Sequence, residues 1–328
     1  MKRILSIVMG TVMLLGAFAL VACGGGQEAA LKFGMGVYTD VTAATSADAD
    51  VEGQGNVVVT VAAITVDADN KVVACRLDTV DCTVKYTAEG KAIANDGFKT
   101  KAEQGTNYGM VAWGGAAKEW FEQAEAFENL VAGKTLAEIK ALVAEGNKGT
   151  ADVENAGCTI KINEFVNAIE KAFANLADST ATASSAVKVG MHVEQVVADA
   201  SEEKNGSNEL EITAFAAAVD AEGKVLVAAS DCVQIAFTFD VTGASTYDLA
   251  KAVSSKREAG ANYGMVAWGG AAKEWFEQAD AFNALCVGKT ATEIAALCAN
   301  DNYGTDAVKS AGCTIKVNGL AKAAAKIG

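Results

Sequence analysis

The residues of this 328-residue chain that could do chemistry are few in kind, with eight cysteines and a single histidine among many hydroxyl and carboxylate side chains. One imidazole excludes any site that needs two. His192 follows Met191 and has no cysteine near it, so the Cys-x-x-Cys-His haem signature is absent. Because the chain also lacks a Cys-x-x-Cys pair, a thiolate metal site is poorly supported, and we expect no bound metal.

One short motif, Ala-Gly-Cys-Thr, occurs twice, at residues 156–159 and 311–314. Its simplest interpretation is a glycine turn whose threonine starts a strand, and a four-residue turn has low specificity on its own. Cys158 and Cys313 are the only cysteines at matching positions. Five others stand opposite non-cysteine residues and are interpreted as small core residues: Cys75, Cys82, Cys232, Cys286 and Cys298. The sequence does not decide whether Cys286 and Cys298 form a disulfide.

A long internal repeat surrounds this motif. Residues 107–127 recur at 262–282 with one change, Glu125 against Asp280, and the same spacing of 155 relates the two Ala-Gly-Cys-Thr turns. A period this long indicates a tandem domain rather than a solenoid, whose repeats are 20–50 residues long. We expect one domain at 31–177 and another at 186–328. The small polar residues at 178–185 are typical of a flexible linker.

The elements that must position the turn follow the same order in each copy. Two β-rich runs form a hairpin, 56–66 with 71–86 and 209–219 with 224–239, across turns of Asp, Ala, Asn, Glu and Gly. A helix at about 116–131 ends before Gly133, and Thr135-x-x-Glu138 and Thr290-x-x-Glu293 are capping boxes that open a second helix. The turn then leads into 160–162, and Asn163 caps a last helix. The prediction is an α+β fold built twice.

The N-terminus has the pattern of an export signal. Lys2 and Arg3 precede an apolar run that ends in Leu-Val-Ala-Cys at 20–23, followed by three glycines. We expect 1–22 to be a lipoprotein signal peptide, Cys23 to carry the lipid, and 23–30 to form a tether. An uncleaved anchor or an ordinary signal peptide is the alternative. The anchored chain is expected on the extracellular face of the cell membrane.

Composition narrows the classes of protein to which this chain could belong. The formal net charge of −14 disfavours nucleic-acid binding by a basic surface, and the 51% hydrophobic content is too high for a disordered chain. The chain contains no proline, so its turns must be built from glycine, asparagine and aspartate.

The repeated turn resembles the Ser-Gly-Ala-Thr type of motif in the FMN-binding domain family, where a flavin transferase joins FMN to the threonine hydroxyl as a phosphoester. The block Tyr-Gly-Met-Val-Ala-Trp-Gly-Gly-Ala-Ala-Lys-Glu-Trp-Phe-Glu-Gln-Ala is similar to that of surface flavoprotein lipoproteins of bacterial extracellular electron transfer. The resemblance covers nearly all of the chain after the signal segment. This chain departs from the motif at Ala156 and Ala311 and at Cys158 and Cys313, where the family often has serine and alanine, respectively.

The resemblance implies two covalent FMN groups, on Thr159 and Thr314, beside Gly157, Cys158, Gly312 and Cys313. Trp113 and Trp268 are candidate platforms for the flavin ring or, equally, core residues, whereas Trp120 and Trp275 are expected in the core. Lys118 and Lys273 could pair with the phosphate or lie on a solvated helix face. The implied partners are membrane lipid, a flavin transferase, a quinol-oxidising electron donor in the membrane and an extracellular electron acceptor.

Two kinds of function follow from this pattern. The first is an extracellular electron carrier, in which the cofactor supplies the redox chemistry and no substrate-specific enzyme site is needed. The alternative is a cofactor-free lipoprotein whose two similar domains present a ligand-binding or adhesion surface. In the alternative, the near-identical 107–113 and 262–268 blocks would mark a repeated binding site.

Overall fold

The computed structural model describes residues 28–328, so the expected signal segment and Cys23 lie outside the described residues. The described chain is built from two halves of similar element order. The first half contains β1 (Lys32–Thr45), β2 (Gly53–Val66), β3 (Val72–Tyr86), β4 (Ala92–Ile93), α1 (Lys101–Gln104), η1 (Gly105–Tyr108), α2 (Trp120–Val131), α3 (Leu136–Lys140), η2 (Glu145–Asn147), α4 (Ala151–Ala156), α5 (Asn163–Ala174) and β5 (Ala177–Asp178). The second half contains β6 (Ala186–Ala198), β7 (Gly206–Val219), β8 (Val225–Phe239), α6 (Lys256–Ala259), η3 (Gly260–Tyr263), α7 (Trp275–Cys286), α8 (Ala291–Ala295), α9 (Asp306–Ser310), α10 (Asn318–Ala324) and η4 (Ala325–Ile327).

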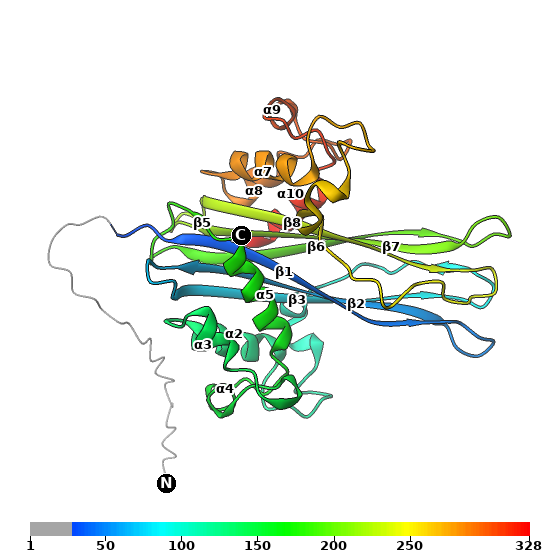
Figure 1. Cartoon of the computed structure of the whole chain (residues 1–328), viewed down its shortest axis with the longest axis horizontal. Coiled ribbons are helices and arrows are strands. Elements are labelled where there is room, and N and C mark those ends of the chain that lie inside the picture. The colour runs from blue at the N-terminus through cyan, green and yellow to red at the C-terminus, as the bar shows by residue number, and fades with distance from the viewer. Residues whose placement is uncertain (1–27) are drawn as a thin grey trace, which may run out of the picture.

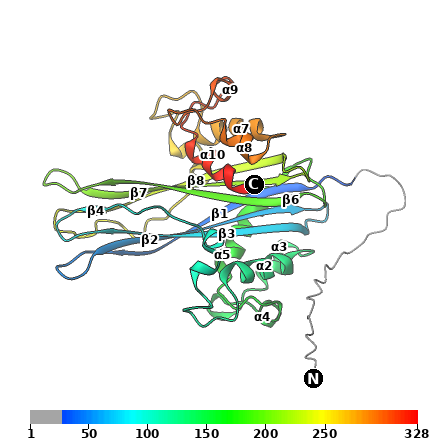
Figure 2. The ribbon, with the colours of Figure 1, turned by 180° about the vertical axis from the view of Figure 1, so that it is seen from behind.

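Four layers make up the structure. Antiparallel sheets of order β4-β3-β2-β1-β5 and β6-β7-β8 lie face to face, and helices cover the outer face of each sheet (Figure 1). Seen from behind, the same hairpins extend well past the helices at one end (Figure 2). Mixed helices and antiparallel sheets confirm the predicted α+β class.

Strand β2 shows why both faces of a sheet must be covered. Val57, Val59 and Val61 pack into the core between the sheets, whereas Ile64 and Val66 pack against the helices. Side chains alternate between the two faces of a strand, so a continuous apolar run requires apolar neighbours on both sides. The predicted hairpin of 56–66 with 71–86 is confirmed as β2 and β3, with Val59 opposite Val80.

The predicted strand pairs omit β1 and β6, which carry glycines where an apolar pattern is expected. A Cβ atom at Gly34 or Gly36 would lie 2.2 or 2.1 Å from a carbonyl oxygen of α5. The glycines therefore allow the helix backbone to lie directly on β1, and they weaken the strand signal in the sequence.

The capping residues of the helices were predicted more accurately than the positions where the helices begin. Thr135 and Thr290 form the predicted capping boxes at the starts of α3 and α8. Gly133 has the expected positive φ, 76°. Two details differ from the prediction: α2 begins at Trp120 rather than near 116, and the residue that caps α5 is Ile162, with Asn163 as the first helical residue. Residues 160–162 form no strand, and one isolated bridge joins Lys161 to Lys148.

Contacts between the halves are reciprocal. The amide of Ala47 donates to the carbonyl of Gly243 (2.7 Å), and the equivalent amide of Ala200 donates to that of Gly90 (2.8 Å). The matched rings of Tyr86 and Phe239 stack on each other, with centroids 4.1 Å apart and planes 9° apart. Such pairing, in which each half uses the same surface, is the pattern of an approximate two-fold axis.

Crossed ion pairs repeat this symmetry. Lys171 of α5 pairs with Glu258 of α6, and Lys326 of η4 pairs with Glu103 of α1 at 2.6 Å. Each glutamate also closes a capping box with its second oxygen, so the same carboxylate starts a helix and contacts the other half. These pairs are partly exposed, so they fix the relative position of the halves more than they add stability.

The segment expected to be a flexible linker, 178–185, is held at several points, although Asp178, Thr180, Ala183 and Ser184 are exposed. Ala177–Asp178 pairs with the start of β1 as strand β5. Leu31 donates its amide to the carbonyl of Ala181, whose side chain is fully buried. The two sheets also share one apolar core, so the halves are joined by more than the chain between them.

We expect Phe239→Ala to lower the free energy of unfolding by about 3–5 kcal/mol, because it removes a fully buried ring at the contact between halves. Tyr86→Phe is the matched control: it keeps the stack and removes only the 2.6 Å bond from Tyr86 Oη to the Thr45 carbonyl, at a cost of about 1 kcal/mol. Urea unfolding followed by circular dichroism measures both. Equal losses for the two variants would show that the stack contributes little.

Candidate functional site

The repeated Ala-Gly-Cys-Thr turns lie at the ends of α4 and α9, against α2 and α7. Gly157 takes a left-handed conformation (φ 101°) directly after α4, and Gly312 takes the same conformation (φ 97°). A Cβ atom there would lie 2.2 Å from the Lys118 ammonium nitrogen, or 2.4 Å from that of Lys273. Glycine is therefore favoured at the turn by its φ angle, while the flexible end of the lysine side chain lies against it.

Thr159 and Thr314 are exposed, and one buried side chain orients each of them. Gln123 Oε1 accepts hydrogen bonds from the Thr159 amide (2.8 Å) and from its hydroxyl (3.0 Å). Gln278 does the same for Thr314 at the same distances. Each glutamine in turn donates its Nε2 to a lysine carbonyl, that of Lys118 or Lys273, at 3.0 Å.

The glutamines are the functional residues that sequence reasoning missed. Gln123 is 1% exposed on α2, where a buried amide needs a polar partner. The available signal was the repeat itself, since Gln123 and Gln278 fall inside the near-identical 107–127 and 262–282 blocks. The threonine hydroxyl donates to the glutamine oxygen, so the threonine oxygen keeps its acceptor capacity.

A buried glutamate fixes the loop that precedes α2. The Glu119 carboxylate accepts the amides of Met110 (2.9 Å) and Val111 (3.2 Å) while its own amide bonds to Glu122. Glu274 makes the matching bonds to Met265 and Val266 at 3.0 and 3.2 Å. The near-identical block is thus one structural unit: a loop, a helix start, and the glutamine that contacts the threonine.

The two matched cysteines do not face the site. Cys158 and Cys313 are fully buried in the apolar clusters beneath the helices. Burial raises the pKa of each thiol to about 11, so both stay protonated at neutral pH and are poor nucleophiles. Among the described residues all seven cysteines are free thiols, and the open pairing of Cys286 with Cys298 is not formed.

The four tryptophans divide into two kinds. Trp120 and Trp275 are buried, as expected. Trp113 and Trp268 are 82% exposed, which excludes core packing for them. Each exposed ring lies over the glycine that opens its loop, Gly109 or Gly264, where a Cβ atom would meet ring carbon at 2.3 or 2.2 Å.

A pocket of about 630 Å³ opens beside Thr314. Its walls combine aromatic residues, lysines and carboxylates with Gln278: Tyr263, Trp275, Tyr303, Lys256, Lys316, Glu194, Glu209 and Glu211. Trp275 thus forms a wall of this pocket, whereas the exposed Trp268 is not among its lining residues. The volume lies within the 300–1,000 Å³ that is typical of small-molecule sites.

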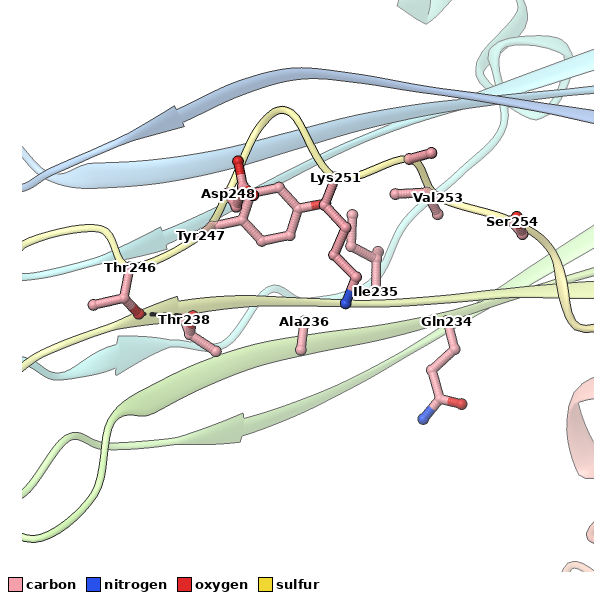
Figure 3. Close-up of a pocket in the computed structure, with 11 residues that line it drawn as sticks. Gln234, Ile235, Ala236, Thr238, Thr246, Tyr247, Asp248, Lys251, Val253 and Ser254 are labelled. Atoms are coloured by element: carbon pink, nitrogen blue, oxygen red, sulfur yellow. Dashed lines mark hydrogen bonds between the residues drawn. The ribbon is translucent and has the colours of Figure 1, made fainter. Parts of the chain in front are cut away.

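Another hollow, of about 590 Å³, lies in the second half between β8 and the segment before α6. Figure 3 shows Lys251 reaching from that segment toward β8, with Tyr247 and Asp248 beside it and Thr246 bonded to Thr238 (2.8 Å). These residues have no counterparts in the repeated blocks, so this hollow is not part of the duplicated site.

Within residues 28–328, no helix is long and apolar enough to cross a membrane, and no group of three or more His, Cys, Asp or Glu side chains is arranged to hold a metal ion. No protein-family model, curated protein or solved structure matches this chain.

Asp78, buried under the first site, positions the start of α1. Its carboxylate accepts the amides of Thr79 (2.8 Å) and Ala102 (3.3 Å), and Asp231 makes the matching bonds to Cys232 and Arg257 in the second half. Burial raises the pKa of Asp78 to about 6, although hydrogen bonds from Thr100, Thr79 and Ala102 oppose the shift.

This raised pKa predicts a pH dependence of stability. The folded state holds the Asp78 proton more tightly than the unfolded chain, whose carboxyl titrates near 3.8, so this group destabilises the fold as pH rises from about 4 to 6. Relative to Asp78→Asn, the wild type should lose roughly 2–3 kcal/mol of unfolding free energy over that range. Urea unfolding of both proteins at several pH values measures the difference, and a constant difference would contradict the prediction.

Proposed function

We propose that this chain is a lipid-anchored, extracellular electron-transfer flavoprotein with one FMN on Thr159 and one on Thr314, each joined by a phosphoester. The observation that carries the proposal is the duplicated arrangement of an exposed threonine, a buried glutamine and a lysine beside a left-handed glycine. Both halves have this arrangement, although their sequences differ elsewhere. Together with the sequence resemblance, this arrangement supports attachment at both turns.

The residues present fit the cofactor. The threonine oxygen is accessible, and the Lys118 or Lys273 ammonium lies against the turn, where it can balance the negative phosphate. Beside Thr314, Tyr263 and Trp275 supply aromatic surface in a pocket of sufficient volume. When bound, FMN supplies the redox chemistry, and the protein positions it and sets its electrostatic surroundings.

In the attachment reaction the chain contributes the nucleophile. A bond forms between the threonine oxygen and the flavin phosphorus of a flavin dinucleotide, the phosphoanhydride bond at that phosphorus breaks, a nucleoside monophosphate leaves, and the base takes the hydroxyl proton. Gln123 orients the hydroxyl but cannot take the proton, because a neutral amide is not a base. We assign the base to the flavin transferase, one of the implied partners.

The rest of the proposal concerns location and electron flow. Lipidation at Cys23 would hold the chain on the outer face of the cell membrane, close to a quinol-oxidising donor. Covalent attachment keeps the flavin from being lost outside the cell. The reduced protein would then pass electrons to an extracellular acceptor.

One observation favours the second candidate, a cofactor-free ligand-binding or adhesion lipoprotein. Trp113 and Trp268 are exposed on matching loops, and large exposed aromatic residues are common in binding surfaces. Flavin attachment separates the two candidates directly.

Purified after co-expression with a flavin transferase, the protein should be yellow and its intact mass should show two FMN adducts. Thr159→Ala or Thr314→Ala should each leave one adduct, because the nucleophilic oxygen is lost at one site only. Cys158→Ala is the matched control and should keep both, since that thiol is buried. A colourless, unmodified wild type would sink the flavin proposal and favour the binding role.

Gln123→Met should slow attachment at Thr159 by roughly tenfold, because a side chain of similar size no longer orients the hydroxyl. Thr314 provides an internal control with its own Gln278. Time-resolved peptide mass spectrometry measures both rates in the same sample, and circular dichroism checks folding. Equal rates at the two threonines would show that the glutamine has no positioning role.

A further inference from the structure

The two candidate sites differ in one ion pair, formed by a buried lysine and a partly exposed glutamate. In the second half, the Lys256 ammonium lies 2.7 Å from Glu211 Oε1, and the lysine side chain is only 8% exposed. The same ammonium lies over the rings of Tyr263 (5.2 Å) and Trp275 (5.8 Å). All four residues line the pocket that contains Thr314.

The first half keeps the lysine and the aromatic residues but not the carboxylate. Lys101 lies over Tyr108 at 5.3 Å, as Lys256 lies over Tyr263. Val58 occupies the strand position of Glu211: it pairs with Asp81, and Glu211 pairs with the equivalent Gln234. Within residues 28–328, no carboxylate oxygen lies within 4.0 Å of the Lys101 ammonium.

Two carboxylates, Asp40 and Asp81, lie opposite Val58 on the neighbouring strands, and neither forms an ion pair with Lys101. Asp81 accepts from the Asn56 side chain at 2.7 Å, and Glu164 accepts from the Thr60 hydroxyl at 3.3 Å. Within residues 28–328, Lys101 therefore has no ion-pair partner beside Tyr108. Lys256 is buried and shares its charge with Glu211, whose side chain is 40% exposed, so the pair interacts more strongly than one fully in water.

We propose that the Lys256–Glu211 pair makes the two sites electrostatically unequal, so that FMN on Thr159 has the more positive midpoint potential and electrons run from the Thr314 site to the Thr159 site. This inference rests on the proposed function. Reduction adds negative charge, which an unpaired cation stabilises more than a neutralised one does. Electrons given up at the second site are taken up at the first, and protons exchange with solvent.

Potentiometry on single-site proteins tests the order. Thr314→Ala retains the first site and should have the more positive midpoint potential; Thr159→Ala retains the second. In the second-site protein, Glu211→Gln should raise the potential, whereas Glu222→Gln, in the exposed β7–β8 turn, should leave it unchanged. In the first-site protein, Val58→Glu should lower it and the size-matched Val58→Gln should not. Equal potentials at the two sites, or no response to Glu211→Gln and Val58→Glu, would overturn the inference.

A second measurement needs no flavin. In the unloaded protein, acetic anhydride should acetylate Lys101 several-fold faster than Lys256, because Lys256 is buried and paired. Glu211→Gln should speed the reaction at Lys256, and Val58→Glu should slow it at Lys101. If labelling follows this pattern in a protein that never accepts FMN, the proposed function fails and the ion-pair difference remains. If FMN loads but the potentials coincide, the inference alone fails.

Discussion

The structure depends on one constraint: the middle strand of each sheet is apolar on both faces. Val57 and Val59 on β2 require a second sheet above them, while Ile64 and Val66 require helices below. A single three-stranded sheet with one layer of helices would leave the first set in water, at about 25 cal/mol for each Å² exposed. Placing the two sheets face to face buries both inner faces at once and generates the reciprocal contacts between the halves.

The same constraint places the candidate sites on the outside. The inner faces join the halves, and both candidate sites lie on the helical side, where α2 or α7 meets the glycine turn. There a buried glutamine and a buried glutamate take up the backbone groups that the loop leaves open. Because each buried polar group must keep its partner, this geometry accounts for part of the near-identity of residues 107–127 and 262–282.

Divergence between the halves is concentrated on the sheet side of the site. The turn, the helix start and the glutamine are shared, whereas the strand residues that face them have changed, as with Val58 and Glu211. Strand positions at the edge of a pocket tolerate such changes because their backbone bonds are made within the sheet whatever the side chain. A duplicated fold can in this way keep one loop and helix arrangement and vary the charges around it.

The sequence by itself determined what local contacts decide: the α+β class, the β2–β3 hairpin, the capping boxes at Thr135 and Thr290, and the glycine turns at 157 and 312. It did not reveal β1, whose glycines make room for the backbone of a helix that comes more than a hundred residues later. Only the tertiary structure showed that Trp113 is exposed, brought Gln123 to Thr159, and fixed parts of segment 178–185 against the sheets. Each of these features depends on contacts between residues distant in sequence. A local sequence pattern does not say which distant surface will pack against a residue.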